Sequence, residues 1–520
     1  MKYLSVEEMI AVEKAADRAG HTYPAMMEAA GKGLAEIIDR KYGSYQDKTI
    51  LALVGSGNNG GDALVALDYL LAWGWTAAGV LLRPRDPQDD LIERMLQRGG
   101  ELLDCSDPVN FPPDLKDRLA KITILLDGVL GTGIRLPLRK PLDQLLNSIQ
   151  EVMDSLGEKP LVVAVDCPSG VDCDSGAVSS CCIPADLTVT MAGVKQGLLR
   201  FPAYNYVGEL VVVDIGLPGN LPEWEEISRE VIEEEWVRQV IPERPLNAHK
   251  GTFGTSLIIA GSQAYPGAAM LAGVSAYRIG AGLVTMAVPQ GIYQPLVTGF
   301  PEGTWIVLDC LEGGIAESAL SSVQGALGRP TGCLIGPGLG QLETTAQFLK
   351  GFIHIADLPT LIVDADGLRL LARLNAWSDV LPQGSILTPH PGELAAMSGL
   401  HMEDIQANRV LIAERFAKEW GQIIVLKGAH TVIANPDGRT RILISADPAL
   451  ARAGSGDVLA GIICGLVTQG VAPFDAAAAG AWVHARAGKT AALLAGSPAA
   501  VLAGEISGAV GKVLADLQEG

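Results

Sequence analysis

The stretch Thr49-Ile-Leu-Ala-Leu-Val54, followed at once by Gly55-Ser-Gly-Asn-Asn-Gly-Gly-Asp62, decides the fold of the first half of the chain. The apolar run is short and continuous, which is typical of a parallel strand that is covered on both faces. The glycine-rich loop then opens a helix-like stretch. Backbone N–H groups at such a helix start can hold phosphate, so Asp62 beside them is a candidate base and not a phosphate ligand.

Apolar runs of the same kind recur through the first half, at residues 76–82, 122–126, 161–165, 187–191 and 209–215. Helix-compatible segments separate most of these runs. A helix is expected over residues 5–40, where Ser5 and Glu8 are spaced as a capping box. This alternation predicts an α/β fold with a parallel sheet and helices on its faces.

The alternation of apolar runs and helix-compatible segments stops in residues 217–248, which contain several prolines and the acidic stretch Glu223 to Glu235. We place the domain boundary there, with a short helix near 228–240, and expect domains over residues 1–220 and 226–520. Strand candidates restart in the second half at 255–260, 283–288, 332–335, 360–364, 385–388 and 422–426. A hairpin over 431–444 is expected to turn at Asn435-Pro-Asp-Gly438, and the Ala-rich residues 456–520 are expected to be helical.

The composition excludes several classes of protein. The net charge is −20 and the Lys and Arg residues are scattered, which argues against nucleic acid as a partner. The N-terminal residues do not form the apolar core of a signal peptide, and no apolar run is long enough for a membrane span. The eight cysteines form no Cys-x-x-Cys pair, which is typical of reduced thiols in the cytoplasm. We therefore expect a cytoplasmic protein that acts on small molecules, with no nucleic acid and no membrane as partner.

Three loops of the first half carry an Asp at a predicted strand end, namely Asp62, Asp127 and Asp166. Because the carboxyl ends of parallel strands meet at one edge of a sheet, we expect these loops to converge on one site. Asn59, Asp127 and Ser169 offer only oxygen ligands, which suit a hard cation and not zinc. Taken singly, each Asp would more often be a turn or cap residue.

A second glycine-rich loop, Gly454-Ser-Gly-Asp457, also follows chain that reads as strand and opens a helix. Its amides would form an anion hole, and Asp457 could take the proton of a hydroxyl. That arrangement is the one needed to pass a phosphoryl group to an alcohol. Each glycine-rich loop thus predicts its own site for a phosphorylated small molecule.

Other loops at predicted strand ends of the second half would complete that site. Lys427 and Thr431 in Lys427-Gly-Ala-His-Thr431 are available to a nucleotide, and Asp364-Ala-Asp366 is where magnesium could be held. The remaining loops are Gly336-Pro-Gly338-Leu-Gly340 and Thr388-Pro-His390-Pro-Gly-Glu393. His390 alone would be read as a turn residue, but among these loops a ligand contact is the preferred interpretation.

Four motifs stand out in the first half: Met27-Glu-Ala-Ala-Gly31, Gly57-Asn-Asn-Gly-Gly-Asp62, Asp127-Gly-Val-Leu-Gly-Thr-Gly133 and Asp166-Cys-Pro-Ser-Gly-Val-Asp172. Together they resemble the NAD(P)H-hydrate epimerase domain, over roughly residues 1–220. The resemblance implies a Rossmann-like three-layer sandwich that interconverts the R and S hydrates at C6 of a damaged dihydronicotinamide. Ala63 departs from the family, which usually has Gly there, and would distort the loop if that position needs a positive φ.

The same resemblance assigns roles in the first half. Potassium would lie on Asn59, Asp127 and Ser169, and Asp166 would touch the substrate and is our choice for proton transfer, with Lys195 as its electrostatic partner. A carboxylate near a fixed cation can move the proton and stabilise a charged intermediate. The implied substrate contacts, besides Asp166, are Asn58, Asn59, Gly60, Gly61, Asp62, Gly131, Thr132, Gly133, Ile134, Arg135, Leu136 and Pro137.

The second-half loops, with Gly251-Thr-Phe-Gly254 ahead of Ala260-Gly-Ser262, are similar to the ribokinase-like NAD(P)H-hydrate dehydratases over about residues 230–520. The resemblance implies a ribokinase-like α/β domain, with Ser455 where the family usually has Thr. The implied nucleotide contacts are Lys427, Gly428, Ala429, His430, Thr431 and Gly456, and the implied hydrate contacts are Ala268 or Ala269, Gly338, His390 and Asp457.

The sequence therefore predicts a bifunctional enzyme that repairs hydrated NADH and NADPH, with ADP or ATP, magnesium and potassium as cofactors, as a homo-oligomer. The first domain would equilibrate the epimers. The second would phosphorylate the C6 hydroxyl of the S form, so that phosphate leaves in place of hydroxide. Two alternatives stay open: a kinase of a small alcohol in the second half, and a first half that only binds ligands.

Overall fold

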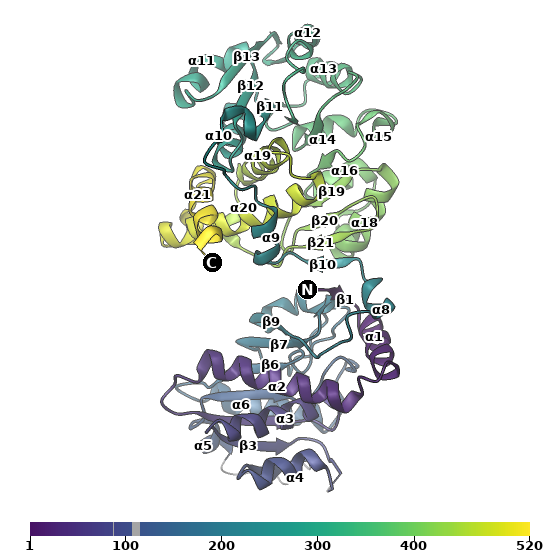
Figure 1. The fold of residues 1–520 in the computed structure, drawn as a ribbon, viewed down its shortest axis with the longest axis vertical. Helices are drawn as coiled ribbons and strands as arrows, with labels where there is room; N and C mark the ends of the chain where they lie inside the picture. The colour runs from purple at the N-terminus through teal and green to yellow at the C-terminus, as the bar shows by residue number, and fades with distance from the viewer. Residues whose placement is uncertain (87, 107–114, 520) are drawn as a thin grey trace. The chain divides into compact units, whose positions relative to one another are not determined.

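The computed structural model describes residues 1–86, 88–106 and 115–519, and the chain divides into two compact units, Met1–Arg229 and Glu230–Gly520 (Figure 1). The division falls inside the Pro- and Glu-rich residues 217–248. Each unit contains one large β-sheet with helices on both of its faces, so the prediction of an α/β fold is confirmed.

Within the described residues, the sheet of the first unit has seven strands, and every neighbouring pair is parallel. In spatial order they are β4 (Glu101–Asp104), β3 (Thr76–Leu81), β2 (Thr49–Val54), β5 (Ile124–Gly128), β6 (Leu161–Val165), β7 (Leu187–Met191) and β9 (Glu209–Val213). The chain runs outward from β2 to β4 and then returns to place β5 on the other side of β2. Ligands of open α/β sheets bind beyond the carboxyl ends of strands at such a reversal point.

Side chains of β2 alternate between two cores, which makes this unit a three-layer sandwich. Ile50, Ala52 and Val54 pack with α2 (Tyr23–Tyr42) and α3 (Asn58–Ala72). Leu51 and Leu53 face the opposite layer. That layer includes α5 (Leu115–Leu119) and α6 (Leu142–Asp154), whereas α4 (Asp90–Gln97) packs with α3. Both faces are buried, which is why the strand reads as a continuous apolar run.

The predicted helix over residues 5–40 is wrong as a single element. The structure has α1 (Val6–Arg18) and α2, separated by a turn in which Gly20 has φ +96°. The capping box of Ser5 and Glu8 is confirmed. Two short strands were not predicted, β1 (Tyr3–Leu4) and β8 (Val194–Lys195), which form a parallel pair beside the main sheet.

The sheet of the second unit has ten strands. In spatial order they are β10 (Arg229–Val231), β21 (Thr440–Ile442), β20 (Val432–Ala434), β19 (Ile423–Leu426), β18 (Ile386–Leu387), β17 (Thr360–Val363), β16 (Gly332–Ile335), β11 (Thr255–Ile259), β12 (Leu283–Pro289) and β13 (Thr304–Leu308). Pairs from β19 to β13 are parallel, and β19, β20 and β21 are antiparallel, which confirms the predicted hairpin.

One helix prediction near the boundary is partly wrong. Residues 228–240 were expected to form a helix, but β10 occupies the start of this range and α9 (Glu234–Val240) begins only after it. The backbone N–H of Ile232 donates to the carbonyl of Ile442 at 2.9 Å. The start of the second unit therefore pairs with β21, and β10 becomes the edge strand of the sheet. The strand β10 was not predicted because it lies in an acidic segment, and Glu is uncommon in strands.

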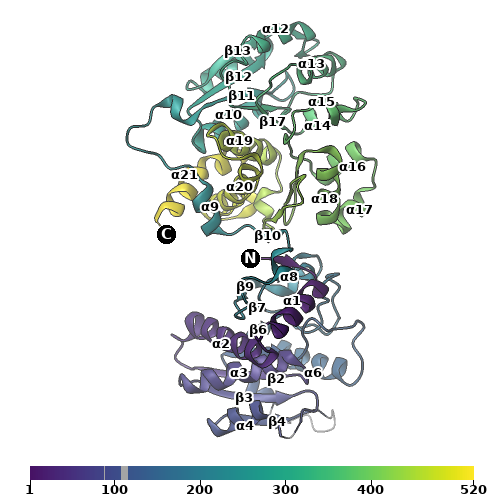
Figure 2. The same ribbon diagram turned by 45° about the vertical axis from the view of Figure 1, so that its right-hand side comes forward.

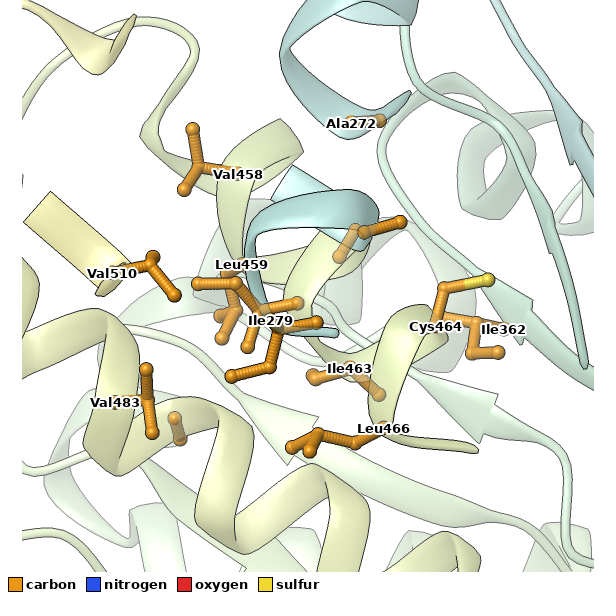
Figure 3. Close-up of a cluster of buried hydrophobic side chains, with 14 of the residues drawn as sticks. Ala272, Ile279, Ile362, Val458, Leu459, Ile463, Cys464, Leu466, Val483 and Val510 are labelled. Carbon is orange, nitrogen blue, oxygen red and sulfur yellow. The ribbon is translucent and has the colours of Figure 1, made fainter. Parts of the chain in front are cut away.

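The helices of the second unit form two groups (Figures 1 and 2). One core joins the sheet to α10 (Pro266–Arg278), α19 (Ser455–Thr468), α20 (Pro473–Ala495) and α21 (Ala503–Glu519), which confirms the helical C-terminal region. The other core joins the opposite face to α13 (Glu343–Ile353), α14 (Asp366–Leu371), α16 (Pro391–Ser398) and α18 (Arg409–Trp420). Figure 3 shows Leu459 and Ile463 of α19 beside Ile279, at the end of α10.

The packing of α19 on α10 depends on glycine. A Cβ atom added at Gly461 would lie 2.3 Å from the carbonyl oxygen of Ala272, so the helices must separate to accept it. We expect Gly461→Ala to destabilise the second unit by about 1–3 kcal/mol, the usual cost of overpacking. Calorimetric thermal unfolding measures the effect. Gly508→Ala in α21 is the control, because nothing lies within 4 Å of its added Cβ, and an equal loss of stability in both variants would contradict the packing argument.

Candidate functional sites

A cavity of about 510 Å³ lies at the carboxyl ends of β2, β5 and β6 in the first unit. Its walls include these predicted residues: Asn58, Asn59, Asp62, Gly131, Thr132, Gly133, Ile134, Asp166 and Lys195. The other predicted contacts do not line it, namely Gly60, Gly61, Arg135, Leu136 and Pro137. Gly60 instead packs on the loop backbone, since an added Cβ would lie 2.1 Å from the carbonyl oxygen of Gly55.

An ion pair is buried at one wall of this cavity. The Nζ of Lys195 lies 2.5 Å from Oδ1 of Asp166, and only 1% of the lysine side chain is exposed. The same carboxylate oxygen accepts hydrogen bonds from the Thr190 hydroxyl at 3.0 Å and the Met191 N–H at 3.1 Å. Lys195 also donates to the carbonyl of Met191 at 2.7 Å. The pairing expected between Asp166 and Lys195 is therefore present, and it presents an oriented carboxylate to the cavity.

The three expected cation ligands are joined by hydrogen bonds around Leu130. The Ser169 hydroxyl donates to Oδ1 of Asp127 at 2.5 Å and accepts from the Leu130 N–H at 2.9 Å. The Asn59 amide donates to the Leu130 carbonyl at 2.9 Å. Burial raises the pKa of Asp127, against the hydrogen bonds from Ser169. This donor set offers only oxygen ligands, one of them from a buried carboxyl group, so it fits a hard cation, and potassium is one such ion.

Asp62 lies deep in the same cavity wall. Burial raises the pKa of Asp62 well above its ordinary value, and the nearby charges of Asp166 and Glu13 raise it further. Both effects favour the protonated form of this carboxyl group over that of an ordinary Asp. Ala63 beside it lies inside α3, where the backbone is helical, so the concern about a positive φ was wrong.

Sequence reasoning missed several residues of the cavity wall. Glu13 and Tyr23 come from α1 and α2, and no motif marks them. Arg83 follows β3, a strand that was predicted, and β3 lies next to β2 in the sheet. The strand-end rule applied to β3 would have found this arginine.

In the second unit, four neighbouring parallel strands end in the predicted loops. These strands are β16, β17, β18 and β19, and their loops begin at Gly336, Asp364, Thr388 and Lys427. The Nζ of Lys427 lies 2.7 Å from Oδ1 of Asp364 and 3.8 Å from Oε2 of Glu393. The Thr388 hydroxyl donates to the same oxygen of Asp364 at 2.6 Å.

The second glycine-rich loop lies close to this lysine. Gly454 has φ +89° and caps α19, and a Cβ added at Gly456 would lie 3.4 Å from Nζ of Lys427. Burial, with the charge of Asp364, raises the pKa of the partly exposed Asp457 to about 7, and Lys427 opposes the shift. The expectation that this loop directly follows a strand is wrong, because the 3-10 turn Pro448–Leu450 separates it from β21.

The predicted hydrate contacts differ in accessibility. Ala268 is partly exposed and packs on Gly338, where an added Cβ would lie 2.8 Å from the Ala268 Cβ, whereas Ala269 is fully buried. His390 does cap α16, because its Nδ1 accepts from the Gly392 N–H at 3.0 Å. Its Nε2 lies 3.2 Å from Oε1 of Glu393, so both ring nitrogens have partners, although 45% of the side chain is exposed.

The expected nucleotide loop, Lys427–Thr431, has residues with positive φ, and hydrogen bonds from side chains stabilise its backbone. Gly428 and His430 have positive φ, and the Thr431 hydroxyl donates to the Gly428 carbonyl at 2.9 Å. Arg409, which sequence reasoning missed, donates from NH2 to the carbonyls of Leu426 and Lys427 at 2.8 and 3.1 Å. His484 of α20 was also missed, and its Nε2 lies 3.0 Å from the Ser455 hydroxyl. The family difference at Ser455 therefore leaves a hydroxyl that is anchored to the core.

Two further observations concern metals and membranes. One carboxylate oxygen of Asp364, Oδ2, is buried without a hydrogen-bond partner, and a carboxylate oxygen is the kind of ligand that magnesium prefers. The neighbouring Asp366 accepts a hydrogen bond from the Gly340 N–H at 2.9 Å. No cluster of three His, Cys, Asp or Glu suited to a metal ion occurs in the described parts of the chain. Within those parts, no helix has the length and apolar character needed to span a membrane.

Comparisons with known proteins match both units. A family model described as YjeF-related protein N-terminus matches residues 24–197, and one described as NAD(P)H-hydrate dehydratase matches residues 256–510. The bifunctional NAD(P)H-hydrate repair enzyme Nnr of Moorella thermoacetica is 37% identical over 90% of this chain and 88% of its own length. The enzyme of the same name from Escherichia coli K12 is 32% identical over 91% of this chain and 86% of its own.

Among solved structures, the ADP/ATP-dependent NAD(P)H-hydrate dehydratase from Bacillus subtilis, co-crystallised with ATP/Mg2+, is similar to this chain. It is 33% identical with a TM-score of 0.48, over 55% of this chain and 98% of that chain.

Proposed function

The chain belongs to the family of bifunctional NAD(P)H-hydrate repair enzymes, and from this membership we propose how its two sites divide the epimerase and dehydratase activities. Residues 1–220 form the epimerase domain, and residues 226–520 form the dehydratase domain. The first interconverts R- and S-NAD(P)H hydrate. The second converts the S hydrate to NAD(P)H at the expense of ADP or ATP. The observation that carries the dehydratase assignment is Asp457, a carboxyl group with a pKa raised to about 7 beside a helix start and a lysine.

In the epimerase site, Asp166 transfers protons to and from the hydrate. Its carboxylate faces the cavity and is oriented by Lys195, Thr190 and Met191. The residues Asn58, Asn59, Asp62 and 131–134 bind the substrate around it. Potassium on Asn59, Asp127 and Ser169 would supply a fixed positive charge near this wall.

In the dehydratase site, Asp457 takes the proton of the C6 hydroxyl as that oxygen attacks the terminal phosphorus of the nucleotide. The amides of Gly454 to Gly456 and the ammonium of Lys427 stabilise the charge on the migrating phosphoryl group. Phosphate then leaves C6 with the electron pair of the C6–O bond, a proton is lost from the ring, and the dihydronicotinamide is restored. Lys427 to Thr431 and Gly456 bind the nucleotide. Ala268, Gly338 and His390 bind the hydrate, and Asp364 and Asp366 would hold magnesium.

The test is incubation of mixed R and S hydrate with the protein and ADP or ATP, followed by absorbance in the dihydronicotinamide band. Recovery of both epimers is the expected result. If only the S hydrate is converted to NADH faster than the spontaneous rate, and the R hydrate is not, the epimerase assignment is rejected. A stable phosphorylated product without recovered NADH would instead indicate a kinase of a small alcohol.

The dehydratase rate is expected to depend on the ionisation of Asp457. The pKa of Asp457 is raised to about 7, and a base must be deprotonated, so kcat should fall as the pH drops below about 7. The measurement is kcat at saturating S hydrate and nucleotide across the pH range. A profile that stays flat down to the ordinary Asp pKa would contradict this role.

We also propose that the protein is a cytoplasmic homo-oligomer. None of the eight cysteines, all of which lie in the described residues, is joined in a disulfide bond, as expected for a reducing compartment. Light scattering of the purified protein and fractionation of cells test the two proposals separately.

A further inference from the structure

The first helix of the chain forms part of the wall of the epimerase cavity. The parallel pair of β1 and β8 places Leu4 opposite Lys195, and the Val6 N–H donates to Asp174 at 2.8 Å. These contacts fix α1 beside the buried ion pair. Ile10 and Glu13, which are three residues apart and therefore on one face of α1, both line the cavity.

The surroundings of Glu13 differ from those of Asp166. No residue of the described chain donates a hydrogen bond to the Glu13 carboxyl group, whereas Asp166 accepts three hydrogen bonds, one of them from an ammonium. Burial raises the pKa of Glu13, Lys195 opposes the shift, and the charge of Asp166 adds to it. Glu13 is therefore more readily protonated than an ordinary glutamate, whereas the Asp166 carboxylate is paired with the ammonium of Lys195.

The ionisable groups that face Glu13 come from several elements. Lys195 belongs to β8, Asp166 follows β6, and Asp62 lies on α3. Tyr23 begins α2, and burial together with the charge of Glu13 raises its pKa. Among these groups, the carboxylate of Asp166 is paired with an ammonium, whereas the carboxyl group of Glu13 is not. Two carboxyl groups in such different environments are the usual arrangement for a base and an acid in one site.

We propose that Glu13 is a second catalytic group of the epimerase site, acting as the acid that complements Asp166. The proposal rests on the epimerase function proposed above. Asp166 takes the proton of the C6 hydroxyl, and the C6–O bond becomes a carbonyl. The electron pair of the C6–N1 bond moves to N1, which takes a proton from Glu13. Rotation about C5–C6 turns the other carbonyl face to N1, and closure of the ring reverses both proton transfers, so no oxidant or other reactant is consumed.

The experiment compares Glu13→Gln with the wild-type chain and with Glu7→Gln, a control on an exposed position of the same helix. Exchange between purified R and S hydrate is followed by chromatography, and kcat and KM are measured across the pH range. We expect Glu13→Gln to lower kcat by about 100-fold or more with little change in KM, because general acid catalysis contributes about that much. The wild-type kcat should decline as Glu13 ionises at higher pH, and the residual rate of Glu13→Gln should lack this decline.

Glu13→Asp should retain part of the rate, since it keeps a titrating group one methylene shorter, and circular dichroism should show that the variants fold alike. A Glu13→Gln enzyme with kcat within about twofold of wild type, or with the same alkaline decline, would overturn the assignment of Glu13 while leaving the epimerase function intact. A wild-type chain that does not exchange the epimers would overturn the proposed function itself.

Discussion

Replacing Asp457 with asparagine is expected to abolish recovery of NADH from the S hydrate, with a loss in kcat of about 10²–10⁴-fold, while nucleotide binding stays largely intact. Asparagine has nearly the same shape but cannot accept the proton of the C6 hydroxyl. The nucleotide contacts proposed at Lys427 and Thr431 are not altered by the change. Turnover is measured by absorbance of the recovered coenzyme, and nucleotide affinity by calorimetry.

The stability of the same variant separates catalysis from folding. In the folded chain the pKa of Asp457 is raised to about 7, so the ionised carboxylate costs stability at neutral and higher pH. Asparagine removes that cost, and the melting temperature should hold or rise as activity disappears. Asp379→Asn, at an exposed position of α15 (Trp377–Val380), is the control and should change neither quantity. Undiminished turnover in Asp457→Asn would reject Asp457 as the base.

Asp166→Asn should stop epimer exchange and also destabilise the first unit by about 3–5 kcal/mol. The substitution leaves the ammonium of Lys195 buried, with 1% of its side chain exposed, and removes its carboxylate partner. Removing one partner of a buried pair is costly because the other charge remains in a poorly solvated site. Exchange is followed by chromatography, and stability by calorimetric unfolding.

The double variant Asp166→Asn with Lys195→Met is the matched test. It removes both charges, so most of the lost stability should return, but exchange should stay absent. Dehydration of purified S hydrate by the second unit serves as the internal control and should be unchanged in both variants. If the double variant recovers exchange, Asp166 is not the proton-transfer group; if the single variant is as stable as wild type, the ion pair is not a structural element.

Much of the fold could be predicted because buried parallel strands leave continuous apolar runs. The runs beginning at Thr49 and Thr255 are each flanked by helices on both faces, so no polar alternation interrupts them. Two edge strands were not predicted because they lack that signature: β4, with Glu101 and Asp104 at its ends, and β10, with Arg229 and Glu230. The edge strand β9 keeps an apolar run and was predicted. An edge strand has one unpaired side, and charged residues there prevent association with other chains.

Many of the site residues that could be predicted, such as Asp166, Asp364 and Lys427, lie in loops directly after strands. The residues that were missed reach the sites from elsewhere. Glu13 projects from a helix whose sequence reads as an ordinary amphipathic surface helix, and Arg409 reaches the nucleotide loop from α18. Their roles depend on tertiary packing, which one sequence does not encode in any local pattern.

The strand β10 has a practical consequence for work on the second unit alone. A truncated chain that starts at Ile232 would lack Arg229–Val231 and would leave β21 as a new, uncapped sheet margin. Such margins recruit neighbouring molecules and promote precipitation. A recombinant fragment of the dehydratase half should therefore start before Ser228, so that it contains β10 and β21 remains paired.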